Sequence, residues 1–326
     1  MQALRVETLS GDLSGVHLVD WPAPDRAPGE VLVRVKAASL NFPDLLMTKG
    51  TYQFKPLVPF TCGLELAGEV IEAEPESGFV PGDMVIGGNK TGAFAEIASI
   101  PVGGLSALPD GLTFAQGAAM GAAYQTAYTG LIELCDLQPG QWVLVHGASG
   151  GVGLAACDLA KAKGARVIAA TGVQAKREAI AAAVSPEAVI TARGRFREQV
   201  ADLTDGKLCE IVFDPVGGDV FDESTRCVSF AGKLVVVGFT SGRIAELATN
   251  IPLIKGFSVV GLRAGEYARR FPKRGKSINE AIAKFAESGH ITPVIDRTLS
   301  LSDWREGFEA MAARELVGKV VFEPDS

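Results

Sequence analysis

A glycine-rich loop between an apolar strand and a helix constrains the fold of this chain more than any other feature. Gln141 to His146 reads as a buried strand, and the loop Gly147 to Gly153 follows it directly. Leu154 to Lys163 then reads as a helix, which Gly164 ends. Glycines let a backbone approach a pyrophosphate closely, and the first turn of a helix offers free N–H groups and the positive end of its dipole. In this context the loop predicts dinucleotide binding, although Ala148 replaces the first glycine of the usual fingerprint.

The alternation of strands and helices continues on both sides of this loop. Helices are expected from Thr113 to Leu134, which is rich in alanine, and from Lys176 to Ala183. Four further apolar runs read as strands: 166–170, 211–214, 233–238 and 257–262. Strands that alternate with helices indicate βαβ units on a parallel sheet. We therefore predict an α/β Rossmann domain with a doubly wound parallel sheet over residues 121–265.

The chain before this region is expected to form a different, β-rich domain. Glu30 to Lys36 alternates apolar and polar residues with period two, which is typical of a half-buried strand. Residues 67–72 and 84–86 also read as strands, and the turn Pro81-Gly82-Asp83 separates them. Residues 1–120 therefore predict a domain of short strands.

The C-terminal tail has a third sequence pattern. Lys276 to Ser288 places apolar residues on one helical face, and Asp303 with Glu306 is a candidate capping box for a last helix. We expect this tail to fold back, so that residues 266–326 complete the domain formed by residues 1–120.

Charge and cysteine content exclude several classes of function. The formal net charge is −7 and the isoelectric point about 5.2, which disfavours nucleic acid as a partner. The five cysteines are odd in number and form no CxxC pair, which favours a reducing cytoplasm over a disulfide framework. The N-terminus does not resemble a signal peptide, and the longest uncharged stretch, 111–132, contains four glycines and several polar residues. We therefore expect a cytoplasmic protein that does not span a membrane.

The end of the second Rossmann strand indicates which dinucleotide is bound. NAD-binding folds carry an acidic residue there to hold the ribose hydroxyls, but this strand ends Ala169-Ala170-Thr171-Gly172. Lys176 and Arg177 follow shortly after and can neutralise a 2′-phosphate. The cofactor is therefore predicted to be NADPH.

The same loop also satisfies the G-x-S-x-G pattern of a hydrolase nucleophile elbow. In that alternative Ser149 is the nucleophile, His290 is the one histidine available downstream, and Asp214 supplies the acid. Substitution of Ser149 would then abolish activity, whereas a dinucleotide-binding loop would only be weakened.

Four motifs in fixed order resemble one enzyme family. They are Ala38-Ser39-Leu40-Asn41-Phe42-Pro43-Asp44, Gly63-Leu64-Glu65-Leu66-Ala67-Gly68, Pro81-Gly82-Asp83 and Ala148-Ser149-Gly150-Gly151-Val152-Gly153. Together they resemble the zinc-free quinone oxidoreductase (zeta-crystallin-like) branch of the medium-chain dehydrogenase/reductase superfamily, over essentially the whole chain. The resemblance implies a GroES-like substrate domain, a Rossmann domain and a cleft between them. It also implies a homodimer joined through Rossmann edge strands near residues 257–262.

The resemblance also argues against a metal. Asn41 stands where zinc-dependent relatives carry their first cysteine ligand, and Leu64 stands where they carry a histidine. Their structural four-cysteine lobe would fall near residues 90–110, which contain no cysteine. We expect Cys62 and the three histidines to be structural or surface residues.

Several residues acquire candidate roles by the same resemblance. Asn41 and Tyr52 are the candidate catalytic residues: Asn41 as an amide donor to a developing oxyanion, Tyr52 as a pocket residue and possible proton donor. Leu46 replaces a frequent pocket tyrosine, which weakens the case for quinones. The predicted cofactor-binding residues are Asn41, Thr126, Ser149, Gly150, Gly151, Val152, Gly153, Thr171, Lys176, Arg193, Gly238, Phe239, Thr240 and Lys319. In this set Arg193 lies beside Ala192, which replaces a 2′-phosphate tyrosine, and Lys319 is expected to reach the cofactor phosphates.

These features predict an NADPH-dependent, zinc-independent reductase of quinones or α,β-unsaturated carbonyls. Two alternatives stay open. Six basic residues between Arg263 and Lys276 could attract a phosphorylated substrate, as in an enoyl-CoA-type reductase. The chain could also be a nucleotide-binding structural protein without turnover.

Overall fold

The computed structural model describes residues 1–325 and divides the chain into two compact units. Unit 1 comprises Met1–Gly121 and the chain from Pro293 on, and unit 2 comprises Ala122–Thr292. Unit 1 therefore combines the N-terminal residues with the last part of the chain. This last part begins at Pro293, and the helix predicted at 276–288 packs with unit 2.

Unit 2 contains a six-stranded, fully parallel sheet in the order β11-β10-β9-β12-β13-β14. Its strands are β9 (Trp142–Val145), β10 (Arg166–Thr171), β11 (Ala188–Thr191), β12 (Cys209–Asp214), β13 (Val228–Val236) and β14 (Ser258–Gly261). Numbered along the chain, the order is 3-2-1-4-5-6, which is the Rossmann arrangement. In this arrangement ligands bind outside the carboxyl ends of the strands, where the order reverses between β9 and β12.

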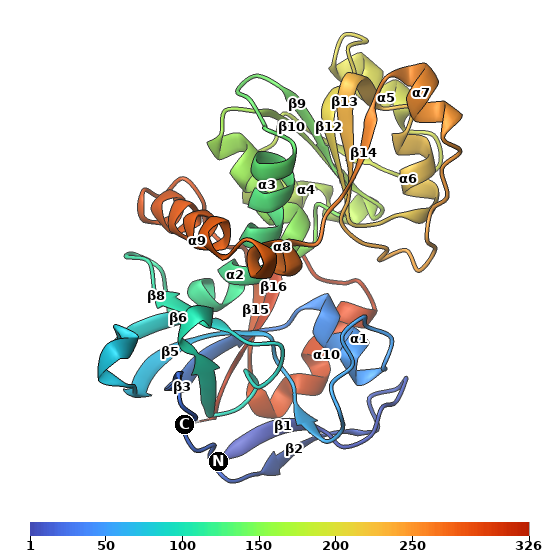
Figure 1. The fold of residues 1–326 in the computed structure, drawn as a ribbon. Helices are drawn as coiled ribbons and strands as arrows, with labels where there is room; N and C mark the ends of the chain where they lie inside the picture. The colour runs from blue at the N-terminus through green and yellow to red at the C-terminus, as the bar shows by residue number, and fades with distance from the viewer. Residues whose placement is uncertain (326) are drawn as a thin grey trace. The chain divides into compact units, whose positions relative to one another are not determined.

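Helices cover both faces of this sheet (Figure 1). On one side lie α3 (Gly151–Ala162) and α4 (Arg177–Val184), and on the other lie α5 (Arg197–Leu203), α6 (Gly218–Ser224) and α7 (Asn250–Lys255). The remaining helices of the unit are α8 (Ala264–Arg270) and α9 (Pro272–Glu287). The predicted helix at 113–134 is an α-helix, α2 (Phe114–Tyr128), that continues as one π-helical segment, Thr129–Leu134.

Unit 1 is built from two sheets. The larger runs β15-β16-β3-β5-β6-β8 with β7 also paired to β3, and the smaller runs β2-β1-β4. The strands are β1 (Gln2–Val6), β2 (Val16–Asp20), β3 (Glu30–Ser39), β4 (Phe60–Thr61), β5 (Glu65–Glu72), β6 (Met84–Gly88), β7 (Ile97–Pro101), β8 (Leu105–Ala107), β15 (Ile295–Ser300) and β16 (Lys319–Glu323). The first and the last described residues, Met1 and Asp325, both belong to this unit.

Two helices pack on the core of unit 1: α1 (Phe42–Thr48) and α10 (Trp304–Ala312). The capping box predicted at Asp303 does not form, since that residue makes no side-chain cap and Glu306 pairs with Arg297 instead. A capping box is present at α1, where Asn41 is the N-cap and Asp44 is the third helical residue. Short one-turn helices at 75–77, 102–104, 174–176 and 301–303 complete the structure. Within residues 1–325, no helix combines the length and the apolar character that crossing a bilayer requires.

Candidate functional site

The glycine-rich loop has the geometry of an anion-binding turn. Gly147 has a φ of +59°, which favours glycine. A Cβ added to Gly153 would lie 2.2 Å from the Gly147 carbonyl oxygen, so only glycine permits this approach of helix and loop. The N-cap of α3 is Gly150, and no side chain caps the helix. The first turn of a twelve-residue helix therefore keeps its N–H groups for an external acceptor, at the carboxyl end of β9.

The end of the neighbouring strand β10 carries no acid. Its last residue, Thr171, is buried, and its hydroxyl accepts a hydrogen bond from the Val173 N–H at 3.1 Å. Arg193 lies against this turn, because its Nε donates to the Gly172 carbonyl at 2.6 Å. The two terminal nitrogens of that guanidinium have no partner among the described residues, and the side chain is exposed. Lys176 ends the one-turn helix just beyond.

The loops after β12 and β13 are bonded to each other. Thr240 donates both its N–H and its hydroxyl to the Pro215 carbonyl, each at 3.1 Å. The Asp214 carboxylate accepts N–H groups from Val216 at 2.8 Å and Gly217 at 3.0 Å, which fixes this turn. These contacts place the predicted segment Gly238 to Thr240 at the same edge of the sheet as the glycine-rich loop.

A partly exposed hydrogen-bond network joins α2 to α3. The Tyr124 hydroxyl donates to Asp158 Oδ2 at 2.6 Å, and the Thr292 N–H donates to the same oxygen at 2.9 Å. Burial raises the pKa of Tyr124 and also that of Asp158. Thr126, a predicted cofactor residue, donates its hydroxyl to the Ala122 carbonyl within α2. Sequence reasoning missed Tyr124 and Asp158, because no local motif links residues on two different helices.

The arrangement that a hydrolase would need is not assembled. The His290 ring is bonded to the Ser288 hydroxyl at 2.6 Å, and the Asp214 oxygen that makes hydrogen bonds is used by backbone N–H groups. The other histidine of the unit, His146, is buried and its Nε2 meets Ser224 Oγ at 2.8 Å. Burial lowers the pKa of His146 to about 3, so it is neutral at pH 7. The hydrolase alternative has no geometric support.

In unit 1 the ends of three neighbouring strands bring Asn41, Glu65 and Lys319 together. Val321 pairs with Ser39 and Ser39 pairs with Glu65, so Lys319 of β16 stands opposite Asn41, beside the first residue of β5. Lys319 Nζ donates to Asn41 Oδ1 at 2.7 Å and to Glu65 Oε1 at 3.0 Å. Asn41 Nδ2 donates to Glu65 Oε1 at 2.8 Å. We call Asn41, Glu65 and Lys319 the amide–ammonium cluster.

The sequence analysis assigns roles to two members of this cluster, Asn41 and Lys319. Asn41 was expected to donate from its amide, but both amide hydrogens have acceptors in the structure, Glu65 and the Ser39 carbonyl at 3.2 Å. Lys319 is buried, with 6% of its surface exposed, and its ammonium faces Asn41 and Glu65. The predicted contact of Lys319 with the cofactor phosphates is the alternative that the Lys319 variants described below distinguish.

Asp44 lies beneath the cluster. It is fully buried, and its Oδ2 accepts the Asn41 N–H at 2.9 Å. Loss of hydration raises the pKa of this carboxyl to about 8, against the opposing effects of the Asn41 N–H and the Lys319 charge. Asp44 is therefore largely protonated at pH 7.

The other residues of unit 1 that the sequence analysis singles out are Tyr52, Cys62 and His17. Tyr52 is half-buried and packs against the hydrophobic cluster of the unit. Cys62 is buried, and burial raises the pKa of its thiol well above the ordinary value. His17 lies on β2. In the described part of the chain, no group of three or more His, Cys, Asp or Glu side chains is arranged to hold a metal ion.

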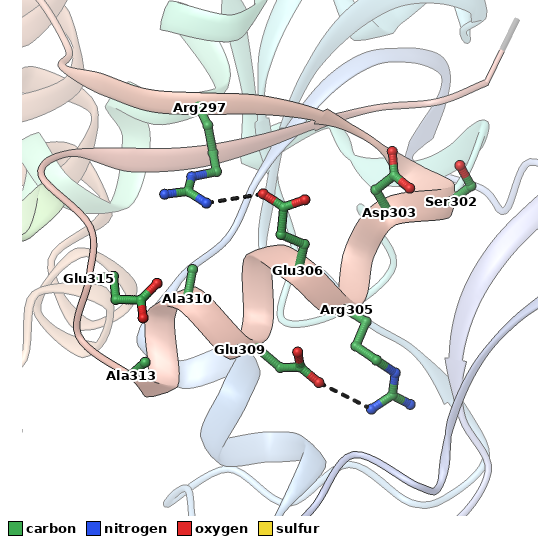
Figure 2. A pocket seen from close by; sticks show the side chains of 9 residues that line it. All are labelled: Arg297, Ser302, Asp303, Arg305, Glu306, Glu309, Ala310, Ala313 and Glu315. Carbon is green, nitrogen blue, oxygen red and sulfur yellow. Dashed lines mark hydrogen bonds and ion pairs between the residues drawn. The ribbon is translucent and has the colours of Figure 1, made fainter.

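One surface hollow of about 500 Å³ lies away from all these residues, along α10 (Figure 2). Four of its charged side chains form two ion pairs, Arg297 with Glu306 at 3.0 Å and Arg305 with Glu309 at 3.8 Å, and two further carboxylates, Asp303 and Glu315, also line it. None of the predicted site residues lines this hollow, so it is not part of the candidate site.

Comparisons with known proteins match both units. The model of the alcohol dehydrogenase GroES-like domain matches residues 27–110, and that of the zinc-binding dehydrogenases matches residues 151–312. A quinone oxidoreductase-like protein 2 homolog of Nematostella vectensis is 36% identical over 90% of this chain and 81% of its own length. A quinone oxidoreductase of Pseudomonas aeruginosa is 32% identical over 94% of each chain. The chain belongs to the zeta-crystallin-like, quinone oxidoreductase branch of the medium-chain dehydrogenase/reductase superfamily.

Solved structures agree with this assignment. A probable oxidoreductase from Mycobacterium abscessus superposes with a TM-score of 0.91 at 33% identity, over 99% of each chain. The mycobacterial protein Rv1454c, solved in complex with NADPH, has a TM-score of 0.89 at 27% identity, over 99% of this chain and all of its own. The protein is therefore an oxidoreductase with a GroES-like unit and a Rossmann unit.

Proposed function

We propose that this oxidoreductase uses NADPH to reduce quinones or α,β-unsaturated carbonyl compounds without a metal. The observation that carries the proposal is the uncapped amino end of α3, behind a glycine loop at the reversal point of the Rossmann sheet. A dinucleotide held there by its pyrophosphate would supply a hydride from its reduced nicotinamide. The residues of the chain bind and orient it.

The residues present fit a dinucleotide. Gly150, whose own N–H donates to the Gly147 carbonyl at 2.9 Å, leaves room for the pyrophosphate, and Gly151 to Gly153 in the first turn of α3 leave N–H groups for it. The second strand ends in a neutral threonine, so no carboxylate there repels a 2′-phosphate. Lys176 and Arg193 supply positive charge at this end; Arg193 is held on the Gly172 carbonyl, and its terminal nitrogens have no partner within residues 1–325. This arrangement favours NADPH over NADH.

A nucleotide-binding assay with four proteins tests the cofactor. We expect Arg193→Ala to raise the Kd for NADPH about tenfold, because a charge-assisted hydrogen bond is worth about 1.5–3 kcal/mol. The Kd for NADH should stay unchanged. Lys176→Ala should act in the same direction, while Arg195→Ala, an exposed arginine two residues away, is the matched control. Equal affinity of the wild type for NADPH and NADH would contradict the proposal.

The substrate class rests on family membership and on the absence of an assembled hydrolase triad in unit 2. The enoyl-CoA alternative loses support, because most of the basic run is already paired. Arg269 and Arg270 meet Glu266, Arg274 meets Glu133 and Lys276 meets Glu280. NADPH oxidation against a panel of quinones, enones and enoyl-CoAs decides among these classes. A protein that binds NADPH but oxidises it with none of them would fit the alternative of a structural protein.

We further propose that the protein is a cytoplasmic homodimer. All five cysteines are free and buried, as a reducing compartment permits. Strand β14 pairs only with β13 and leaves its other edge unpaired within the described chain. That edge is the predicted dimer contact.

A further inference from the structure

A count of hydrogen-bond donors in the amide–ammonium cluster shows where an oxyanion could be held. The Asn41 amide has two hydrogens, and both have acceptors. Its oxygen accepts from Lys319. The Lys319 ammonium has three hydrogens and only two acceptors among the described residues, Asn41 and Glu65. The one unused donor of the cluster is therefore a lysine N–H.

The surroundings make this donor strong. The exposed fractions of Asn41, Glu65 and Lys319 are 8%, 6% and 6%, whereas Ser39 and Asp44 beneath them are completely buried. The three residues thus stand at the outer edge of a dry region, where water screens a charge poorly. The ammonium lies between two fixed acceptors, so it needs no rearrangement to receive an anion.

We infer that Lys319 is a catalytic residue that donates its free N–H to the substrate oxygen as negative charge develops on it, and that Asn41 and Glu65 are positioning residues. The inference rests on the proposed function. Hydride addition to the β-carbon of an enone breaks its C=C π bond and leaves the electron pair on the carbonyl oxygen as an enolate. NADPH is the reductant, and one proton from water completes the saturated ketone. Lys319 keeps its own protons and stabilises the anion.

The variants separate this catalytic role from two other roles of a buried lysine, binding the cofactor phosphates and forming a structural ion pair. Lys319→Met removes the donor but leaves the Glu65 charge unpaired, which lowers stability. The double variant Lys319→Met/Glu65→Gln removes both charges and restores a neutral cluster. Lys233→Met is the control, because the Lys233 ammonium also has two acceptors, the carbonyls of Leu134 and Cys135, but lies in unit 2.

Three measurements are made on each protein: kcat with an enone, the Kd for NADPH, and binding of 4-nitrophenolate with and without NADP⁺. The phenolate oxygen imitates the enolate, and its visible absorption reports binding without turnover. For Lys319→Met and the double variant we expect kcat to fall about 10²- to 10³-fold, as for other oxyanion donors. Phenolate affinity should fall at least tenfold (~1.4 kcal/mol), with the Kd for NADPH within twofold of wild type.

Two results would overturn the inference. A raised Kd for NADPH with unchanged kcat would assign Lys319 to the cofactor phosphates, and unchanged constants with a lower melting temperature would make the cluster a structural ion pair. Failure of the proposed function looks different, since the wild type itself would then bind no NADPH or reduce no substrate. In that case the phenolate affinities of the wild type and of Lys319→Met still show whether the Lys319 N–H binds an oxyanion.

Discussion

At the scale of the residue, the most constrained group in unit 1 is the Asp44 carboxyl. It lies on the first turn of α1 and is completely buried beside a lysine and a second carboxylate. The charge of Lys319 does not compensate for lost hydration, so the pKa of Asp44 rises to about 8. The folded protein therefore holds a proton that the unfolded chain, with an ordinary aspartate pKa near 3.8, has released.

This difference predicts how stability changes with pH. Between about pH 4 and pH 8 the folded state binds one more proton than the unfolded state at Asp44. The contribution of this proton to the free energy of unfolding is complete below the unfolded pKa. It is lost as pH rises through the folded pKa, at up to ~1.4 kcal/mol per pH unit. Asp44→Asn keeps an acceptor for the Asn41 N–H and removes the titration. We expect urea unfolding at pH 5, 6, 7 and 8 to show the variant gaining stability relative to wild type at each step.

The buried His146 changes stability with pH in the opposite direction, so its effect has to be separated from that of Asp44. Its folded pKa of about 3 lies below the ordinary 6.5, so its contribution is lost as pH falls from 6.5 towards 3. Both proteins in the comparison carry His146, so its effect cancels in the difference between them. Parallel stability profiles for wild type and Asp44→Asn would show that Asp44 is ionised in the folded protein.

The residue scale is also where the sequence is least informative about the site. Asn41 and Lys319 are both predicted site residues, but they lie far apart in the chain, and only the register of β16 on β3 makes them neighbours. Glu65 lies in a motif that the sequence analysis identifies, yet its bonds to both residues depend on the pairing of β3 with β5. Long-range strand register leaves no local signal, so the donor count that singles out Lys319 requires the structure.

At the scale of the element, the strand, loop and helix around Gly147 to Gly153 are predicted well. The strand is β9 and the helix is α3, which begins at Gly151, three residues earlier than the apolar pattern indicates. The difference arises because glycines at a helix start lack the apolar side chains that mark the period. Two glycines of the loop are required for different physical reasons: Gly147 because its φ is +59°, and Gly153 because a Cβ there would meet the Gly147 carbonyl oxygen.

Substitution of Gly153 and of Gly150 separates the effect on helix packing from the effect on nucleotide binding. A Cβ on Gly153 would lie 2.2 Å from the Gly147 carbonyl oxygen, whereas one on Gly150 meets that same oxygen at 3.5 Å, an ordinary contact. We expect Gly153→Ala to lower the melting temperature by several degrees, in line with a cost of about 1–3 kcal/mol, and to weaken NADPH binding. Gly150→Ala should keep the melting temperature and weaken binding alone. Equal melting temperatures for the two variants would contradict the packing argument.

At the scale of the whole molecule, the hydrophobic period and the alternation of strands and helices predict the architecture. Tertiary packing decides where one unit ends and the other begins. The alternation after Thr113 predicts the parallel sheet, and the sheet order 3-2-1-4-5-6 agrees with it. The sequence alone does not place α9 in either unit, because an amphipathic pattern does not say which unit its apolar face joins. In the structure it packs against α8, and Gln125 of α2 bonds to Asn279 at 3.2 Å, so the helix belongs to unit 2.

The largest remaining expectation at this scale is the homodimer. Strand β14 has a free edge, and Val259 on it is 40% exposed. Large apolar side chains near this end of the sheet are exposed as well: Phe230 at 84%, Leu253 at 81% and Ile254 at 76%. A free strand edge with exposed apolar neighbours costs solubility unless another chain covers it. A second copy related by a two-fold axis can add its own β14 and bury both sets.

Light scattering behind a sizing column tests this arrangement. We expect the wild type to have twice the 34.1 kDa mass of one chain. Val259→Glu should shift the protein to the mass of one chain, because it would place like charges close together across the symmetric contact. Leu57→Glu is the control, because Leu57 is 90% exposed in unit 1, far along the chain from β14. A wild type of single-chain mass, or a dimer that survives Val259→Glu and dissociates with Leu57→Glu, would place the contact elsewhere or remove it.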